Sequence, residues 1–401
     1  MLVFQLLYGA CFQLSLSQGF LPKHQKRSDL ANGSQRFHTL NTAFEWLATE
    51  RALEHDAYAG ISWLDPSRDS EISCTYGDST VEMPLYPIGS TYLPSETVHT
   101  LNNVHPRNIE MALDLIRSQD RRFCVVLYAA DTGRIAHKGI VMRVVDLNIQ
   151  DEGDGEIRRI LVKCRPEKVV AIESILNPEA FSQESQIRKS KEYLRAKVRL
   201  QSPILVVSEG ETEDIIADLT EDYNAVRTMY KDGVGKRDLP HYITDFSESL
   251  PEWTSRNFKT DIDIWKSCEV WQTLCNTLRE GRQMILSADR NEAMVAAAMK
   301  KGGPLNLPIH IEDLEPDVRR ELVDMEVQCQ ADFQKLGMDP CLAFQALISL
   351  ETALERLHFL SWMVRRERNR LESLALTERN FEKEDDPELP RKGAWFEGEF
   401  E

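Results

Sequence analysis

The chain has 401 residues, of which 42% are hydrophobic and 8% aromatic, so it can bury the cores of two or three domains and is not globally disordered. Its formal net charge of -17 excludes a large electrostatic footprint for nucleic acid or for an anionic membrane, although a local basic patch remains compatible with it.

The N-terminus has a two-part composition. Residues 1–16 are apolar and uncharged, with the length of a signal-peptide hydrophobic region and too short for a membrane span. Residues 17–40 are basic and poor in acidic side chains. This combination resembles the presequences of plastid proteins in algae with secondary plastids, where a phenylalanine follows the cleavage point, as Phe20 follows Gly19 here. We predict a targeting presequence over 1–40 and a plastid (chloroplast stroma) location. A secretory signal or a cytosolic chain with an ordinary N-terminus is the alternative.

Residues 38–58 have helical periodicity, and residues 60–80 are rich in Asp, Ser and Gly. We therefore predict an N-terminal helix and linker over 41–80. The next stretch, 83–101, carries Pro84, Pro87 and Pro94 among apolar residues. Because proline cannot donate a ladder hydrogen bond, we place Pro84 and Pro87 at a sheet edge or at the start of a strand.

Residues 81–200 are predicted to form one helix and several short strands. The helix covers 105–120, with Pro106 in its first turn and an apolar face made by Ile109, Ala112, Leu113 and Ile116. Tight turns, including 131–134 and the acidic hairpin tip 151–156, separate the strands, which favours a small β-barrel or folded-over sheet. The predicted strands are 121–129, 135–147, 157–164, 167–174 and 192–200.

After residue 201 the pattern becomes helical, and 201–377 is predicted to be an α-helical domain. One helix is expected to begin at Asp261 as N-cap and to stop at Gly281. The last helix is expected to run from Asp339-Pro340 to about Leu376, as a bundle helix in preference to a coiled coil. A disordered acidic tail is predicted over 378–401. The other predicted helices cover 210–233, 282–304 and 311–337.

Catalytic motifs are missing from the sequence. The nearest approach to a phosphate-binding loop has Tyr230 in place of its first glycine and Arg237 in place of the hydroxyl residue. Neither Gly-x-Ser-x-Gly nor His-Glu-x-x-His occurs, and the nine histidines do not cluster. We predict a protein that is not an enzyme; an activity assembled from scattered residues remains the alternative.

Metal and cofactor sites are not indicated either. The eight cysteines include no Cys-x-x-Cys pair and no zinc spacing, so we predict reduced, buried thiols and neither metal nor cofactor. The basic run from Arg365 to Arg370 is interpreted as a solvated helix face, with an anion or RNA contact as the alternative.

The order of short phrases from Met83 to about Leu200 resembles the Lon protease N-terminal (substrate-binding, PUA-like) domain family. The departures are His105, where the family has an acidic residue, and Asn108, where it has an aromatic one. The matching phrases are Met83-Pro84-Leu85-Tyr86-Pro87-Ile88-Gly89, Leu93-Pro94, Pro106-Arg107, Phe123-Cys124-Val125-Val126, Gly139-Ile140-Val141, Asp154-Gly155 and Tyr193-Leu194-Arg195-Ala196-Lys197-Val198.

The resemblance implies an α+β protein in which a PUA-like β-barrel domain (81–200) precedes an α-helical bundle domain. Because no ATPase or protease motif accompanies it, the chain resembles stand-alone Lon-domain proteins, for which binding of unfolded or client proteins is the usual inference. A role in protein quality control, with a protease or chaperone complex as a further partner, would follow. PUA-like folds also bind RNA, which the acidic charge makes unlikely, and a scaffold subunit of a larger plastid complex is a third possibility.

A peptide site in such a domain would be an apolar groove or an open strand edge. We predict Tyr92, Leu93, Val104 and Arg107 at its rim.

Overall fold

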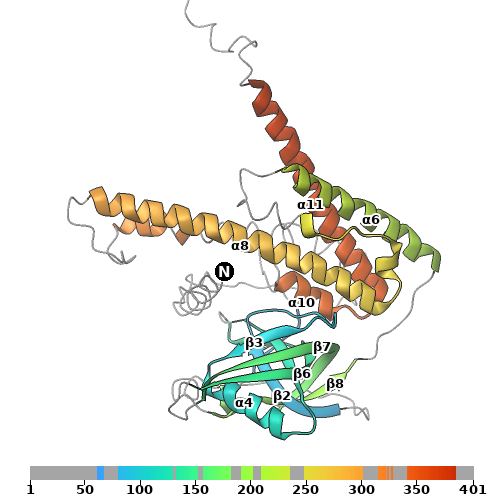
Figure 1. Cartoon of the computed structure of the whole chain (residues 1–401), viewed down its shortest axis with the longest axis vertical. Coiled ribbons are helices and arrows are strands. Elements are labelled where there is room, and N and C mark those ends of the chain that lie inside the picture. Colours follow the sequence, from blue (N-terminus) through green and yellow to red (C-terminus); the bar gives the residue numbers. More distant parts are fainter. Residues whose placement is uncertain are drawn as a thin grey trace, which may run out of the picture. The chain divides into compact units, whose positions relative to one another are not determined.

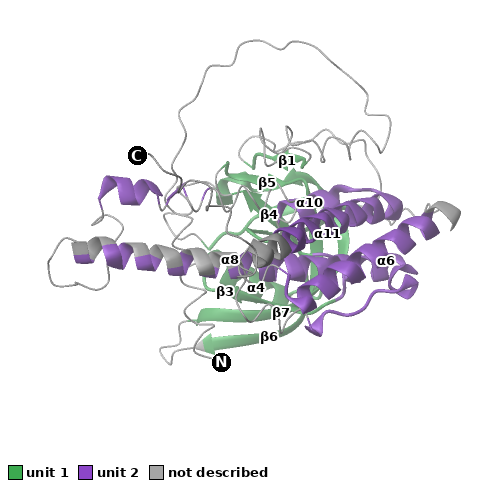
Figure 2. Cartoon of the chain, turned by 90° about the horizontal axis from the view of Figure 1, so that it is seen from above, with its two compact units in different colours: residues 1–52, 58–92, 97–201 green, residues 53–57, 93–96, 202–401 purple. Residues whose placement is uncertain are grey.

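The chain divides into two compact units, shown in the computed structural model in Figures 1 and 2. Unit 1 holds residues 1–52, 58–92 and 97–201, and unit 2 holds 53–57, 93–96 and 202–401. The predicted presequence, the helix over 38–58 and most of the hairpin tip 151–156 lie outside the described residues. The structure describes residues 61–66, 80–129, 132–151, 157–181, 191–201, 209–234, 248–300, 315–321, 323–324, 327 and 341–384.

Unit 1 contains an eight-stranded sheet with a helix packed on it, and the described helices after residue 201 belong to unit 2, which confirms the mixed α+β class. The strands are β1 (Trp63–Leu64), β2 (Thr80–Ile88), β3 (His99–Asn103), β4 (Arg122–Ala129), β5 (Arg134–Ala136), β6 (Lys138–Asp151), β7 (Ile157–Ile175) and β8 (Arg195–Leu200). The helix is α4 (Pro106–Arg117), and a 3-10 turn, η1 (Pro178–Phe181), follows β7.

Five of these strands pair in a closed cycle. β4 pairs with β2, β2 with β8, β8 with β7, β7 with β6, and β6 again with β4. Only the β2–β4 pair is parallel. Beyond the cycle, the first half of β7 continues between β3 and the second half of β6, which gives a three-stranded extension.

The prolines of β2 lie in two halves of the strand that have different partners. Residues Thr80 to Pro84 pair with β8, and Leu85 to Ile88 pair with β4, so the strand changes its partner between Pro84 and Leu85. Each half is paired along one side only, so each proline occupies a local edge of the kind predicted, and a missing N–H is tolerated there. Neither proline stands at the start of the strand, which begins at Thr80.

Two strand boundaries also differ from the prediction. The stretch 135–147 is split at His137 into β5 and β6, and the His137 N–H donates to the Ser62 carbonyl at 2.8 Å. Conversely, 157–164 and 167–174 form one strand that continues through Pro166. The register moves from Val141 opposite Lys168 to Met142 opposite Pro166, so a bulge at Glu167 absorbs the irregularity.

The core of unit 1 lies among alternate residues of the cycle's strands, which is the period-two pattern of a sheet with one buried face. On α4 the buried positions are Met111, Ala112 and Leu115, whereas the predicted face member Ile116 is exposed. The core cluster comprises Leu64, Met83, Leu85, Cys124, Val126, Ile135, Val141, Val170, Ile172, Ile175, Ala180, Leu194, Ala196 and Val198.

Unit 2 is organised by α6 (Glu209–Asp232), η3 (Ser255–Phe258), α8 (Asp261–Lys300), α10 (Leu342–Ser349) and α11 (Ala353–Glu384). Tyr223 of α6 stacks on Trp253 with ring centroids 3.6 Å apart, and Trp253 meets Phe258 edge to face. The Asn224 side chain donates to the Trp253 carbonyl at 2.9 Å and accepts from its N–H at 3.1 Å. These contacts anchor the segment before α8 against α6.

The helix limits around Gly281 differ from the sequence prediction. α8 runs unbroken from Asp261 to Lys300, so Gly281 does not end it. A glycine inside a helix costs only about 1 kcal/mol, and Gly281 is buried. The N-cap is Thr260, which accepts from the Asp263 N–H at 3.2 Å, and the Asp263 carboxylate accepts from the Thr260 N–H at 3.1 Å. Asp261 is therefore not the cap.

The predicted final helix is two helices, α10 and α11, separated at Leu350. Thr352 and Glu355 form the capping pair that starts α11: the Glu355 N–H donates to the Thr352 hydroxyl, and the Thr352 N–H donates to the Glu355 carboxylate. This Thr-x-x-Glu signature is present in the sequence but was obscured by the heptad spacing of the leucines. α11 continues to Glu384, so the disordered tail predicted from residue 378 is wrong for 378–384.

Gly139 of β6 is expected to be essential for the approach of β4 and β6. A Cβ at this position would lie 2.6 Å from the Val125 carbonyl oxygen and 2.6 Å from a Val126 methyl. We expect Gly139→Ala to lower the free energy of unfolding by about 2–3 kcal/mol, because backbone must shift to relieve the contact. The measurement is the urea midpoint of the transition that abolishes the β-sheet circular dichroism.

Gly89→Ala is the matched control, since a Cβ there meets nothing within 4 Å. This variant should unfold within about 1 kcal/mol of the parent. Equal midpoints for the two variants would contradict the steric argument.

Candidate functional site

One side of the three-stranded extension in unit 1 ends in an open strand edge. The pairing of β4 with β6 stops at Arg122 opposite Arg143, after which the Val144 N–H donates to the Arg121 carbonyl at 2.9 Å. From Val145 to Gln150, β6 pairs with β7 and, among the described residues, with no strand on its other side. We call residues 145–150 the β6 edge.

The orientation of the backbone along the β6 edge follows from Leu147. Its N–H donates to Oδ1 of the neighbouring Asp146 at 2.8 Å, so this amide is directed away from β7. Amide direction alternates along a strand, and Ile149 therefore faces the open side as well. Asp146 also accepts from Lys163 Nζ at 3.0 Å, and these two bonds, the lysine first, lower the pKa of its carboxyl.

Apolar side chains line one face of the same segment. Leu147 lies opposite Val162 and Ile149 opposite Ile160, and residues opposite each other share a face of the sheet. Val162 and Ile160 are buried, and α4 packs on β7 and β3. Ile149, by contrast, is 44% exposed, so the apolar face continues past the helix to the open edge.

Further exposed apolar residues flank this region. Val145 at the bulge of β6 is 51% exposed, and Val104, directly after β3, is 45% exposed. Since Asn103 lies opposite Ile160, and Ile160 opposite Ile149, the sheet register brings Val104 and Ile149 to the same end of the extension. Large exposed apolar side chains in one region typically mark an interaction surface.

The four residues predicted for the rim of a peptide site differ in exposure and in contacts. Val104 is exposed as expected, but Leu93 is only 1% exposed, so its side chain does not face solvent. The Tyr92 ring meets the His99 ring edge to face at 4.9 Å. Arg107 lies over the Phe181 ring at 5.8 Å, and burial lowers the pKa of its guanidinium. Sequence inspection missed the β6 edge, because an open edge depends on strand pairing and not on the strand's own residues.

A shallow hollow of about 640 Å³ lies beside α4. The Tyr193 hydroxyl donates to Asp114 of α4 at 2.9 Å, and burial together with this carboxylate raises its pKa to about 12. Asn177 bridges the Tyr193 carbonyl and the Arg195 N–H, at 2.9 Å and 2.7 Å. These bonds join α4 and β8, so the hollow's central polar groups are committed to the fold. Its lining residues are Glu110, Leu176, Asn177, Lys191, Glu192, Tyr193 and Arg195.

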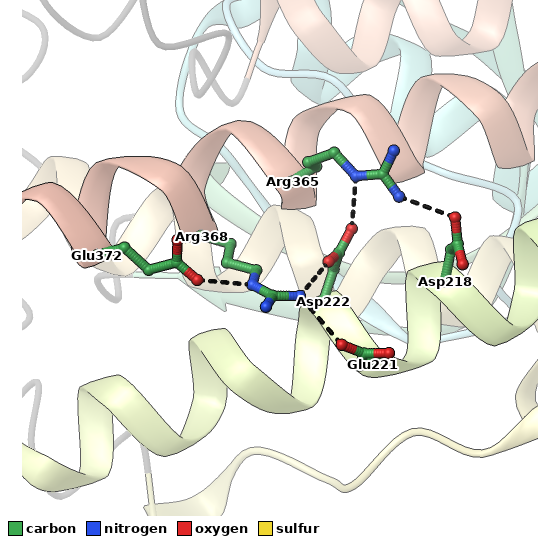
Figure 3. Close-up of polar contacts among 6 residues, drawn as sticks. All are labelled: Asp218, Glu221, Asp222, Arg365, Arg368 and Glu372. Atoms are coloured by element: carbon green, nitrogen blue, oxygen red, sulfur yellow. Dashed lines mark hydrogen bonds and ion pairs between the residues drawn. The ribbon is translucent and has the colours of Figure 1, made fainter.

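The basic run of α11 is an ion-pair network within unit 2 (Figure 3). Arg365 donates to Asp222 of α6 at 2.9 Å and to Asp218 at 3.0 Å. Arg368 donates to the same Asp222 at 2.6 Å, and its pKa is raised by Glu372 and by Asp222. The Asp222 side chain is 7% exposed and is shared by both guanidinium groups. The run is therefore not a free anion site, because its outer arginines are paired with α6, although Arg365 keeps 51% of its side chain exposed, as a solvated face would.

The rest of the run is also engaged. Glu367, which is fully buried, accepts hydrogen bonds from Tyr230 of α6 and from Arg370. Burial and the Glu367 charge raise the pKa of the Tyr230 hydroxyl well above its usual value. Arg366 lies over the Trp362 ring at 5.5 Å. The sequence signal that could have revealed this network is the acidic segment of α6, at helical spacing from Asp218 to Asp222.

Other kinds of site were searched for in the described part of the chain. There, no three His, Cys, Asp or Glu side chains gather as metal ligands. Among the helices that the structure describes, none is both long enough and apolar enough to cross a membrane. The cysteines that can be described are free thiols, and burial raises the pKa of Cys164 and of Cys268 to about 12.

Comparison with known proteins adds two weak likenesses. No family model matches the sequence, and no curated protein matches it. A Lon N-terminal domain protein from Xanthomonas campestris is similar in structure with a TM-score of 0.24 and 16% identity, over 31% of this chain and 61% of that one. The N-terminal domain of the Mycobacterium avium complex Lon protease gives a TM-score of 0.29 and 11% identity, over 49% of this chain and 98% of that one.

Both solved structures are Lon N-terminal domains, the family that the sequence phrases resemble. The chain spans less than two thirds of the Xanthomonas protein's length. Likenesses at these TM-scores carry no argument of their own, so the architecture and the site described above rest on the strand pairing alone.

Asp222 is expected to hold α6 to α11. Removal of this carboxylate in Asp222→Ala leaves two guanidinium groups without their shared, buried acceptor, and should lower the free energy of unfolding by about 2 kcal/mol. Glu221→Ala removes the neighbouring carboxylate, which also contacts Arg368 but is 76% exposed, and should cost less than about 0.5 kcal/mol. Urea unfolding followed by helical circular dichroism measures both, and equal losses would contradict the assignment.

Proposed function

We propose that the protein is a non-catalytic polypeptide-binding protein whose unit 1 captures unfolded or client proteins through the β6 edge and its exposed apolar neighbours. In this proposal unit 1 is a PUA-like β-barrel of the Lon N-terminal type that acts without ATPase or protease domains. The setting proposed from the presequence composition is plastid protein quality control, and the helices of unit 2 are proposed to form a bundle.

The observation that supports this function best is the exposed apolar surface at the extension. Val145, Ile149 and Val104 are each about half exposed; the first two lie on β6, and Val104 directly follows β3. Unfolded chains are distinguished from folded ones by accessible apolar side chains and unpaired backbone. A surface that offers both to a partner can bind such chains without strict sequence specificity.

Two alternatives are less well supported. RNA binding needs cations that are free to meet phosphates, but Arg365, Arg368 and Arg370 are paired with carboxylates within unit 2, and the chain carries a net charge of -17. A scaffold subunit would use the helices of unit 2, and its signature would be a stable large complex on size exclusion of plastid extract.

The test measures, by fluorescence anisotropy, the binding of the intact chain to a small basic protein that has been reduced and carboxamidomethylated, which keeps it unfolded and adds no charge. Ile149→Ser should weaken binding about fivefold, since it removes about 1 kcal/mol of apolar burial in the complex. Leu376→Ser is the matched control, because it removes an exposed apolar side chain from α11, and should bind as the parent does.

Three results would overturn the proposal. The first is that the intact chain binds the unfolded protein no more strongly than an unrelated acidic protein does. The second is an equal loss of binding affinity in Ile149→Ser and Leu376→Ser. The third is salt-dependent retention of single-stranded RNA that exceeds polypeptide binding at physiological ionic strength, which would favour the RNA-binding alternative.

A further inference from the structure

We propose that the ligand binds the β6 edge as an added β-strand, and that it is a neutral or basic extended segment with apolar residues at alternate positions. This inference rests on the proposed function and specifies its mode and its substrate class. It follows from the backbone, the two faces and the charge of residues 145–150.

The backbone of the β6 edge can pair with an added strand. β6 is paired with β7 along this segment, so one row of its N–H and C=O groups is satisfied and the opposite row is directed outward. Leu147 and Ile149 contribute to the outward row, as the Asp146 contact to the Leu147 N–H indicates. An extended segment can complete that row, and six residues are enough for a strand of ordinary length.

The side chains then select the ligand. Leu147 and Ile149 lie on the apolar face, while the intervening Asp146, Asn148 and Gln150 are exposed on the other face. A strand added beside them would place every second residue next to Leu147 and Ile149, where an apolar side chain buries most area. Its remaining residues would lie beside polar groups and water, where Lys, Arg or Thr is favoured.

Charge favours a polypeptide segment over a second copy of this chain. Two copies with a net charge of -17 each repel, whereas a segment with basic residues between its apolar ones is attracted to the acidic protein. The apolar row also continues past α4 on this side, so an added strand extends an existing packed face.

Asp146 protects the β6 edge in the free protein. Its carboxylate occupies the outward Leu147 amide and is held there by Lys163 from β7. A charged residue that covers an outward amide is a common protection of strand edges against uncontrolled pairing. A ligand carbonyl must displace this carboxylate, so occupation of the edge is a competition between Asp146 and the ligand.

The decisive experiment uses labelled eight-residue peptides in which Val alternates with Lys. Their binding to the intact chain is measured by fluorescence anisotropy. Two further peptides carry N-methyl groups on every second residue, in the two possible registers. Because alternate amides of a strand face the same side, one register should lose binding at least tenfold and the other should change less than about twofold. A peptide of the same composition in scrambled order should bind several-fold more weakly, and so should one with Glu in place of Lys.

Asp146→Ala and Asp146→Asn test the protective role of Asp146. The ligand is a Val/Thr peptide, which carries no charge opposite this position. The alanine variant frees the Leu147 amide and should bind several-fold more tightly. The asparagine variant keeps an acceptor oxygen in place and should bind nearly as the parent does. Equal affinities of the parent and the two variants for this peptide would overturn the protective role of Asp146.

The outcomes separate this inference from the proposed function. If unfolded protein binds but both N-methyl registers behave alike, strand addition is wrong and polypeptide binding stands. If neither unfolded protein nor peptide binds, the proposed function itself fails. A dimer by light scattering that the peptide dissociates would assign the edge to a second copy and overturn the ligand class, as would a Glu peptide that binds as well as the Lys peptide.

Discussion

A strand inside a sheet must find partners for the N–H and C=O groups along both of its sides, and β7 meets this constraint over 19 residues by changing its neighbour half-way. Its first half is flanked by β3 and β6, and its second half by β8 and β6. The bulge at Glu167 lets one strand serve both parts without a break. The rest of unit 1 follows from this strand, because it carries the closed cycle and the extension.

The same arrangement explains why an open edge exists at all. The five-strand cycle closes on itself, so each of its strands has a neighbouring strand on both sides for part of its length. β6 is longer than β4, and the excess length from Val145 onward lies beside β7 alone. An edge is thus the consequence of unequal strand lengths at the point where the cycle ends. In the proposed binding mode, Asp146 and the exposed valine and isoleucine residues determine whether that edge stays closed or accepts a partner.

Local signals in the sequence were sufficient for several elements and failed where a distant partner decides the outcome. Pro106 in a first turn and the apolar run after Arg121 correctly predicted α4 and β4. Two separate strands were predicted on either side of residues 165–166, and a helix stop at Gly281, yet a bulge and a continuous helix accommodate these positions. The basic run of α11 could not be interpreted alone, because its partners on α6 lie more than 140 residues away. For the same reason the β6 edge was not predicted, because its open side depends on where the pairing with β4 stops.

The two units use their polar groups in opposite ways. In unit 2, Asp222 of α6 and Glu367 of α11 are buried and bind arginines of α11, so Arg365 and Arg368 are engaged in holding α6 to α11. In unit 1, the outward Leu147 amide of β6 donates to one exposed carboxylate, Asp146, and solvent and salt can weaken the ion pair that holds this carboxylate. A contact of this kind is easily exchanged for a ligand carbonyl, whereas a buried charge cannot leave its partners without a large penalty. The chemistry available for reversible binding therefore lies in the backbone and apolar side chains of unit 1, and the charge network of unit 2 contributes stability.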